Sequence, residues 1–325
     1  MICVHKTNSP RSLRQISENA GYSAAISCTE NLLRLLSVPL RASSIVPWRE
    51  RRPSDLNMTT EPNQSSAGDI CIWRSIREAA VEHVRKEPML ASFLHATILN
   101  HDRFEDAVSF HLAGKLQSNS LSGMQLREVI DHAFLHDADI AESIKADLSA
   151  IRERDPAVNC CMVPLLYLKG LHSLASYRVG HWLWNDGRQL LALHLQNRMS
   201  EVFCTDIHPA ARIGRGILVD HATSVVIGET AVVEDNVSML HEVTLGGTGK
   251  ETGDRHPKVR RNVLIGAGAK ILGNVEIGEG AKIGAGSVVL TEVPPHCTFA
   301  GVPAILVGRP QSEEPSLEMN HGIDI

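Results

Sequence analysis

A repeat of six residues, between Ile207 and Pro310, constrains the fold of this chain more than any other feature of its sequence. Each unit opens with an aliphatic residue, usually has Gly second and carries a small or β-branched residue fifth. The units open at Ile207, Ile213, Val219, Ile227, Val233, Met239, Ile265, Ile271, Ile277 and Ile283. A period of six fits neither an α-helix nor a strand meander, and it predicts a solenoid of short parallel strands.

In such a solenoid the opening aliphatic side chain points into the coil, and Gly permits the backbone angles of the corner. No unit buries its own face, so stability comes from stacked neighbours. A Gly-rich β-sandwich is the alternative architecture. The period argues against it, because turns in a sandwich recur about every 8–12 residues.

The repeat is interrupted at three places, and interruptions of a rigid scaffold are common sites of function. Asp206 and His208 stand at its start. Asp220 and His221 replace the usual Gly and spacer, and a two-residue phase slip follows them. The third interruption is a polar, Gly-rich loop over residues 246–258.

The Gly-Gly-Thr-Gly-Lys run in that loop superficially resembles a nucleotide-binding P-loop. The run lacks the earlier Gly of that motif, and Glu251 follows Lys250 where Ser or Thr is required. We therefore exclude a P-loop.

His221 is the candidate general base of the chain. A neutral histidine can take a proton near pH 7, and a carboxylate usually holds its tautomer. Asp206 precedes His221 by 15 residues, which is not a whole coil, so spacing alone does not pair the two. The alternative is that His221 has only a structural role, as a corner residue that hydrogen-bonds to the backbone.

Residues 68–203 read as a helical domain. Helical spacing of apolar residues predicts helices before Pro88, over Phe104–Leu116 and around Leu126–Ala133 and Ile140–Ile151, with an apolar segment at Met89–Leu99. A long periodic run spans Pro164–Trp184, and Arg188–Phe203 leads into the solenoid at 204–310. We expect the histidines of this half to lie at the surface or to cap helices: His83, His95, His101, His111, His132, His136, His172, His181 and His194.

The two ends of the chain differ from its middle. Residues 1–66 are rich in Ser, Arg and Pro without periodicity, which predicts a disordered or non-native extension before a start at Met58. An organelle transit peptide over residues 1–57 is the alternative. The tail at 311–325 is polar and is expected to be a frayed, flexible terminus.

The amino-acid composition indicates which binding partners and which cellular compartment are expected for this chain. A net charge of −5 gives no electrostatic case for nucleic acid, and no apolar run is long enough for a membrane span. The seven cysteines include no Cys-x-x-Cys pair, so neither a disulfide framework nor a metal site is indicated. A reducing compartment such as the cytoplasm is the simpler prediction.

Several motifs together resemble the serine O-acetyltransferases, a family of hexapeptide-repeat acyltransferases. The resemblance covers roughly residues 70 to 310 and rests on the segments 154–157, 164–170, 180–184, 220–223, 228–231, 243–250 and 253–258. It implies an N-terminal all-helical domain followed by a left-handed parallel β-helix. It also implies transfer of acetyl from acetyl-CoA to L-serine, the first step of cysteine biosynthesis, and feedback inhibition by cysteine.

The resemblance also implies roles for matching residues. His221 would be the base and Asp206 would orient it, whereas Asp155 and Asp220 would bind the serine ammonium group. Arg255 and His256 would hold the serine carboxylate, since a zwitterion needs acids at one end and cations at the other. Acetyl-CoA is a co-substrate rather than a bound cofactor, no metal is expected, and the expected CoA contacts are Gly247, Thr248, Ala267, Lys282 and Ala285.

Two residues of this chain differ from the family pattern. Ser224 stands where the family often has Gly, and Glu242 occupies a position that is more often uncharged. Homotrimers, or dimers of trimers, are the implied assembly. The terminal Ile325 implies docking into O-acetylserine sulfhydrylase.

Two other readings remain at this point. One is a different hexapeptide enzyme, either a sugar acetyltransferase or a γ-type carbonic anhydrase whose metal would need three histidines. The other is a non-catalytic subunit that only docks onto the sulfhydrylase.

Overall fold

The computed structural model describes residues 67–249 and 252–323. These residues fall in one compact unit, Pro62–Ile325. The expectations for residues 1–66 and for the terminal Ile325 therefore lie outside the described residues.

The first part of the described chain is helical. Its helices are α2 (Ala67–Lys86), α4 (Phe104–Leu116), α5 (Gly123–His136), α6 (Ala138–Arg154), α7 (Met162–Tyr167), α8 (Lys169–Asn185) and α9 (Gln189–Phe203), with the short turns η2 (Pro88–Leu90), α3 (Ala91–Leu94) and η3 (His95–Leu99). Local signals set several ends: Pro88 follows α2, Ser122 and Gln125 form a capping box on α5, and Asp137 caps α6. Within the described part of the chain, no helix has the length and apolar character that crossing a membrane requires.

The periodic run over residues 164–184 contains parts of two helices, α7 and α8. Leu168 separates α7 from α8 with an extended backbone, at φ −86° and ψ 109°. The break lets α8 start directly against the solenoid, because a Cβ on Gly170 would lie only 2.0 Å from the carbonyl oxygen of Val219. Packing against the strand thus overrides the local periodicity.

Three histidines of the helical part contradict the expectation of surface or capping positions. His101, His111 and His172 are buried, with 9%, 7% and 3% of their surface exposed. Nε2 of His111 lies 3.1 Å from the Leu166 carbonyl oxygen, and Nε2 of His172 lies 2.8 Å from that of Leu165. Burial lowers the pKa of His111 to about 4 and that of His172 to about 3, so both are neutral at pH 7.

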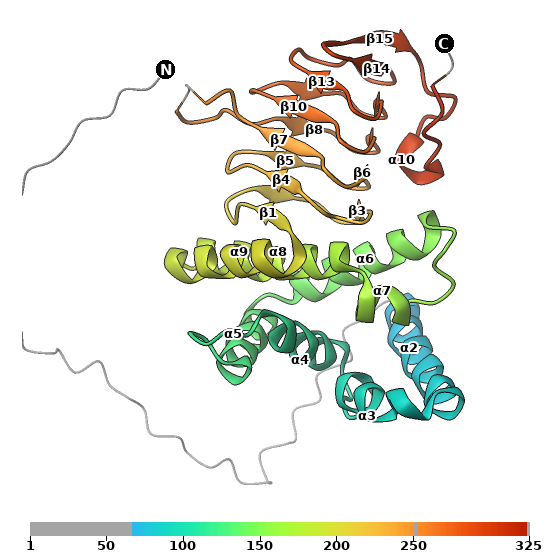
Figure 1. Ribbon diagram of the computed structural model, residues 1–325, viewed down its shortest axis with the longest axis vertical. Coiled ribbons are helices and arrows are strands. Elements are labelled where there is room, and N and C mark those ends of the chain that lie inside the picture. Colours follow the sequence, from blue (N-terminus) through green and yellow to red (C-terminus); the bar gives the residue numbers. More distant parts are fainter. Residues whose placement is uncertain (1–66, 250–251, 324–325) are drawn as a thin grey trace, which may run out of the picture. The chain divides into compact units, whose positions relative to one another are not determined.

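The second part is a parallel β-helix with three sheets, stacked coil upon coil beyond the helices (Figure 1). Sheet A contains β1 (Thr205–Ile207), β4 (Val225–Ile227), β7 (Thr244–Gly246), β10 (Lys270–Leu272) and β13 (Val288–Val289). Sheet B contains β2 (Arg212–Ile213), β5 (Val232–Val233), β8 (Lys258–Val259) and β11 (Glu276–Ile277). Sheet C contains β3 (Leu218–Val219), β6 (Ser238–Met239), β9 (Leu264–Ile265), β12 (Lys282–Ile283), β14 (Thr298–Gly301) and β15 (Ala304–Gly308).

The hexapeptide repeat accounts for this core. Of its opening residues, Ile213 is half-buried and the following are buried: Ile207, Val219, Ile227, Val233, Met239, Ile265, Ile271, Ile277 and Ile283. Adjacent coils pair in parallel register, as Val219 does with Met239 and Met239 with Ile265. The predicted class, helices followed by a parallel β-helix, is confirmed.

A buried ion pair joins the helices to the first coil. The Asp147 carboxylate, fully buried on α6, accepts hydrogen bonds from Arg178 Nε at 3.0 Å and Nη2 at 2.6 Å. Its other oxygen accepts the Ile217 N–H at 2.9 Å, and Arg178 also donates to the Gly214 carbonyl at 2.7 Å. Two helices and the coil that precedes β3 therefore share one polar junction.

The tail is not frayed over its described length. A short helix, α10 (Pro315–Glu318), packs on the solenoid, and the Ser238 hydroxyl donates to the Ser316 carbonyl oxygen at 2.8 Å. Further along the tail, the Gly322 carbonyl oxygen accepts a hydrogen bond from Lys282 Nζ. Specific polar contacts with sheet C thus hold a segment whose composition predicts a free end.

Candidate active site

The phase slip in the repeat forms a corner between β3 and β4, and we call residues 220–224 the His221 corner. The side chain of His221 is 74% exposed there, and its Nε2 lies 3.7 Å from Oδ2 of Asp220. His221, Ala222 and Ser224 adopt positive φ angles of 57°, 56° and 60°. The extra residues thus turn a regular corner into a projecting one that presents a histidine beside a carboxylate.

The two departures from the family pattern lie on this edge. Ser224 and Glu242 each have a φ of 60°, in the left-handed region that Gly adopts most easily. This conformation fits the resemblance, in which Gly often stands at the position of Ser224. The Glu242 N–H donates to the Thr223 carbonyl oxygen at 2.7 Å, so the two positions belong to neighbouring coils of one edge.

A second histidine, His241, lies next to the first. It stands on the next coil, and its ring is 5.8 Å from the His221 ring at an interplanar angle of 76°. The pairing of Val219 with Met239 sets this stacking, since each histidine follows its strand residue by two positions. The sequence analysis considered His241 only as a possible metal ligand of the carbonic anhydrase alternative, whereas the 20-residue coil spacing was a signal that places it beside His221.

Asp206 does not contact His221 within the described chain. It lies exposed on β1, and its Oδ1 accepts a hydrogen bond from Gln196 on α9 at 2.6 Å. The expected orienting role of Asp206 therefore has no contact inside one chain to support it.

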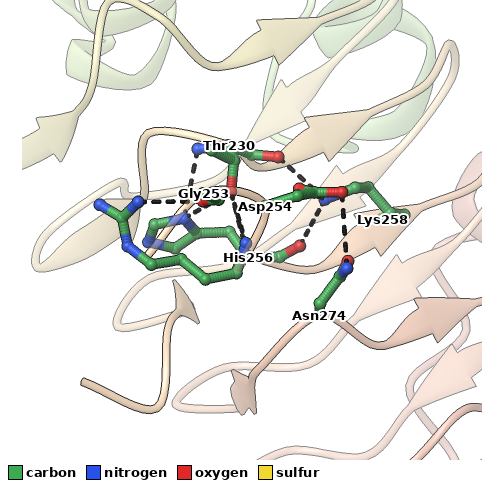
Figure 2. A network of polar contacts seen from close by, with 7 residues as sticks. Thr230, Gly253, Asp254, His256, Lys258 and Asn274 are labelled. Atoms are coloured by element: carbon green, nitrogen blue, oxygen red, sulfur yellow. Dashed lines mark hydrogen bonds and ion pairs between the residues drawn. The ribbon is translucent and has the colours of Figure 1, made fainter. Parts of the chain in front are cut away.

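The long loop between β7 and β8 is anchored on Thr230 (Figure 2). The Thr230 hydroxyl oxygen accepts the backbone N–H groups of Arg255 and His256, at 3.0 and 3.1 Å. Lys258 Nζ donates to the Thr230 carbonyl at 3.0 Å and to Asp254 Oδ1 at 2.6 Å. These contacts fix the loop end that carries the two predicted carboxylate-binding residues.

His256 is held as a neutral ring in this network. Its Nδ1 accepts the Thr230 N–H at 3.2 Å, which leaves Nε2 to carry the proton. Burial is the main cause that lowers the pKa of His256, and the positive charge of Arg255 adds to it. A Cβ on Gly228 would lie 2.0 Å from His256 Nε2, so the ring occupies the space that this glycine leaves.

Arg255 and Glu229 form an ion pair beside that ring. Arg255 Nη2 donates to Glu229 Oε2 at 2.7 Å, and this hydrogen bond lowers the pKa of Glu229. His208 lies within electrostatic reach of both, and burial lowers its pKa. The loop side of the site is thus a basic cluster with one fixed carboxylate.

Asp155 is placed at the end of α6, where it is half-buried. Its carboxylate accepts the Ala157 N–H at 2.9 Å. The preceding Arg154 is 7% exposed and donates from Nη1 to the Ser238 hydroxyl on β6 at 3.0 Å. Asp155 directly follows α6 and Asp220 directly follows β3, and these two elements contact each other.

The residues expected to contact CoA differ in their solvent exposure: four lie at the surface of the solenoid, and one is buried under the tail. Gly286 N–H donates to the Ala267 carbonyl at 2.8 Å, which places Ala267 and Ala285 on successive coils of one edge. Gly247 and Thr248 begin the long loop after β7. Lys282, by contrast, is 6% exposed beneath the tail.

The fold and the site together define a class of protein. A parallel β-helix of hexapeptide units, with a projecting histidine and a basic loop on its edges, is the architecture of the hexapeptide-repeat transferases. The family described as bacterial transferase hexapeptide (six repeats) matches residues 256–291. The family described as serine acetyltransferase, N-terminal, matches residues 72–176 in the helical part.

Similarity to known proteins shows which family within this class the chain belongs to. The serine acetyltransferase of Salmonella typhimurium is 58% identical over 249 residues, which are 77% of this chain and 91% of that protein. A Neisseria gonorrhoeae serine acetyltransferase in complex with serine is 52% identical with a TM-score of 0.71, covering 72% of this chain and 96% of its own. A Brucella abortus serine acetyltransferase in complex with coenzyme A is 51% identical with a TM-score of 0.73, covering 75% and 98%. The chain belongs to the serine acetyltransferase family.

Proposed function

We propose that this chain transfers the acetyl group of acetyl-CoA to the hydroxyl of L-serine, giving O-acetyl-L-serine and CoA. The observation that carries the proposal is the His221 corner, which exposes a histidine beside Asp220 in a chain of this family. The serine and coenzyme A complexes of similar proteins support the choice of acceptor and donor.

In the proposed reaction His221 takes the hydroxyl proton while the serine oxygen attacks the thioester carbonyl carbon. The tetrahedral intermediate then collapses, the carbon–sulfur bond breaks, and the protonated His221 returns its proton to the leaving thiolate. Asp206 is proposed to orient His221 in the assembled enzyme.

Serine recognition is proposed to use opposite charges at the two ends of the amino acid. Asp155 and Asp220 would bind the ammonium group, whereas Arg255 and the Nε2–H of His256 would bind the carboxylate. Cysteine presents the same ammonium and carboxylate groups with a thiol in place of the hydroxyl. We therefore expect it to compete at this site as a feedback inhibitor.

The proposed site is completed between subunits of a homotrimer, or of a dimer of trimers. His221 lies at a corner between sheets C and A, whereas Arg255 lies at a corner between sheets A and B of the same coil stack. A neighbouring copy would bring the second corner to the first. CoA would lie along this edge at Gly247, Thr248, Ala267 and Ala285, and a contact with Lys282 would require the tail to move.

Two further predictions concern partners and compartment. We predict that the terminal Ile325 docks into O-acetylserine sulfhydrylase. The described contacts of α10 would stay in place if only the residues that follow α10 extended toward the partner. A reducing, cytoplasmic location agrees with the free cysteines of the described chain, Cys160, Cys161, Cys204 and Cys297.

An acceptor panel tests the proposed function. Purified full-length chain is mixed with acetyl-CoA and with L-serine, D-serine, glucosamine or galactoside, and the released thiol and acetylated product are measured. We expect release with L-serine alone, and a product heavier by one acetyl group. Release with a sugar only, or none with L-serine from folded protein, would contradict the proposal, and metal analysis would then test the carbonic anhydrase alternative.

A further inference from the structure

The His221 corner has a backbone that its own residues disfavour. His221, Ala222 and Ser224 all have a Cβ, yet their φ angles lie between 56° and 60°. Residues with a Cβ avoid the left-handed region because the Cβ approaches a backbone carbonyl oxygen. Contacts from outside the corner must therefore stabilise this conformation.

Backbone hydrogen bonds hold the end of the corner. The Ser224 N–H donates to the Cys204 carbonyl oxygen at 2.7 Å, and the Thr223 carbonyl oxygen accepts the Glu242 N–H at 2.7 Å. Both contacts act after His221 in the chain. The position of His221 itself depends on what holds its own peptide group.

Lys169 adds a side-chain contact to this peptide group from the helical part, through the Thr223 hydroxyl. It is the first residue of α8, and its Nζ donates to the Thr223 hydroxyl oxygen at 2.5 Å. A lysine ammonium group has donors only, so the hydroxyl accepts from Lys169 and keeps its own hydrogen to donate. The His221 carbonyl oxygen accepts the Thr223 backbone N–H at 2.7 Å and also lies 3.4 Å from that hydroxyl, with the geometry of an acceptor.

The start of α8 lies directly against the strand that leads into the corner. Gly170, the residue after Lys169, lies so close to β3 that a Cβ would meet the Val219 carbonyl oxygen at 2.0 Å. Val219 is the last residue of β3 and directly precedes the corner. The close contact between Gly170 and Val219 therefore places the side chain of Lys169 within reach of the His221 corner.

We infer that Lys169 is a positioning residue for His221, acting through the Thr223 hydroxyl. The inference rests on the proposed function, in which His221 is the general base. A base displaced by about 1 Å loses up to about 100-fold in rate, so a contact of this kind acts on kcat.

Four variants of the full-length chain test the inference by kcat and by KM for each substrate. We expect Lys169→Met and Thr223→Val each to lower kcat by about 10- to 100-fold, with serine KM changed less than about 3-fold. Thr223→Ser keeps the hydroxyl and should recover most of kcat. The double variant Lys169→Met/Thr223→Val should be no slower than the slower single variant, because both changes remove one chain of contacts.

Lys86→Met is the matched control, since Lys86 forms an exposed ion pair with Glu82 on α2 and its loss should leave kcat unchanged. Unaltered kcat in an active Lys169→Met enzyme, or multiplied losses in the double variant, would overturn the inference alone. A raised KM for acetyl-CoA without loss of kcat would also overturn it, since Lys169 would then bind CoA. A wild-type chain without serine-dependent release would overturn the proposed function, and the inference with it.

Discussion

At the residue scale, the space left by one glycine decides where a predicted substrate-binding side chain lies. Gly228 belongs to a motif of the resemblance, and the ring of His256 fills the position of its missing Cβ. Thr230, two residues later, fixes the tautomer of that ring through its N–H. The motif 228–231 is therefore a seat for His256, although its residues lie 25 or more positions earlier in the chain.

Gly228→Ala should raise the KM for serine by about 10-fold or more, because the His256 ring must move and its hydrogen bond to a carboxylate is lost. Steady-state kinetics with varied serine measure the effect. Gly114→Ala is the control, because nothing lies within 4 Å of its added Cβ in α4. Equal serine KM in both variants would contradict this role of Gly228.

The buried pair His111 and His172 predicts a pH dependence of stability. Their pKa values fall to about 4 and about 3 on folding, from an ordinary 6.5, so the unfolded chain binds more protons between those values. The pair has no effect above about pH 6.5, and below it the free energy of unfolding falls by up to about 1.4 kcal/mol per pH unit for each histidine. Thermal unfolding midpoints between pH 7 and 5 measure this slope. His111→Gln should flatten it, and an unchanged slope would contradict the assignment.

At the element scale, the sequence predicts the repeated strands of the solenoid, but it does not predict individual contacts that occur once in the fold. Aliphatic residues every six positions predicted the coil interior, and the break in the repeat after Val219 indicated a candidate functional position. The junction of Asp147 with Arg178 joins residues 31 positions apart without any pattern, so only the folded chain reveals it. The same holds for the tail, where a few specific contacts outweigh a polar composition.

Asp147→Asn should destabilise the fold by about 3 kcal/mol or more, because it leaves the Arg178 charge buried without a counter-ion. Chemical denaturation of the two chains measures the difference. Asp139→Asn, which removes the exposed partner of Arg215, should change stability little. Equal stability of the two variants would show that the buried pair is not what joins α6 to the first coil.

At the scale of the whole molecule, the candidate site is split. The described chain brings Asp220, His221 and His241 to one edge and Glu229, Arg255 and His256 to another. The resemblance implied roles for Asp220, His221, Arg255 and His256, and the structure places His241 and Glu229 beside them. In the proposed function these two edges meet through a second copy of the chain, and one sequence does not predict the geometry of such a meeting.

Mixing two inactive variants tests the shared site. His221→Ala and Arg255→Ala each remove one side, so a mixed oligomer contains some sites with both sides intact. Random assembly from equal amounts should restore about a quarter of the sites. The measurement is serine-dependent thiol release after co-refolding or co-expression. If activity stays at the level of the separate variants, then one chain holds the whole site.

The most direct test of the account is the rate of thiol release from acetyl-CoA on addition of L-serine, compared among wild type, His221→Ala and His83→Ala. His83 lies exposed on α2, away from the described site, and its variant should match wild type. We predict that His221→Ala loses about 10²–10⁴-fold in kcat while remaining folded. Wild-type kcat in folded His221→Ala would contradict the assignment of His221 as the base.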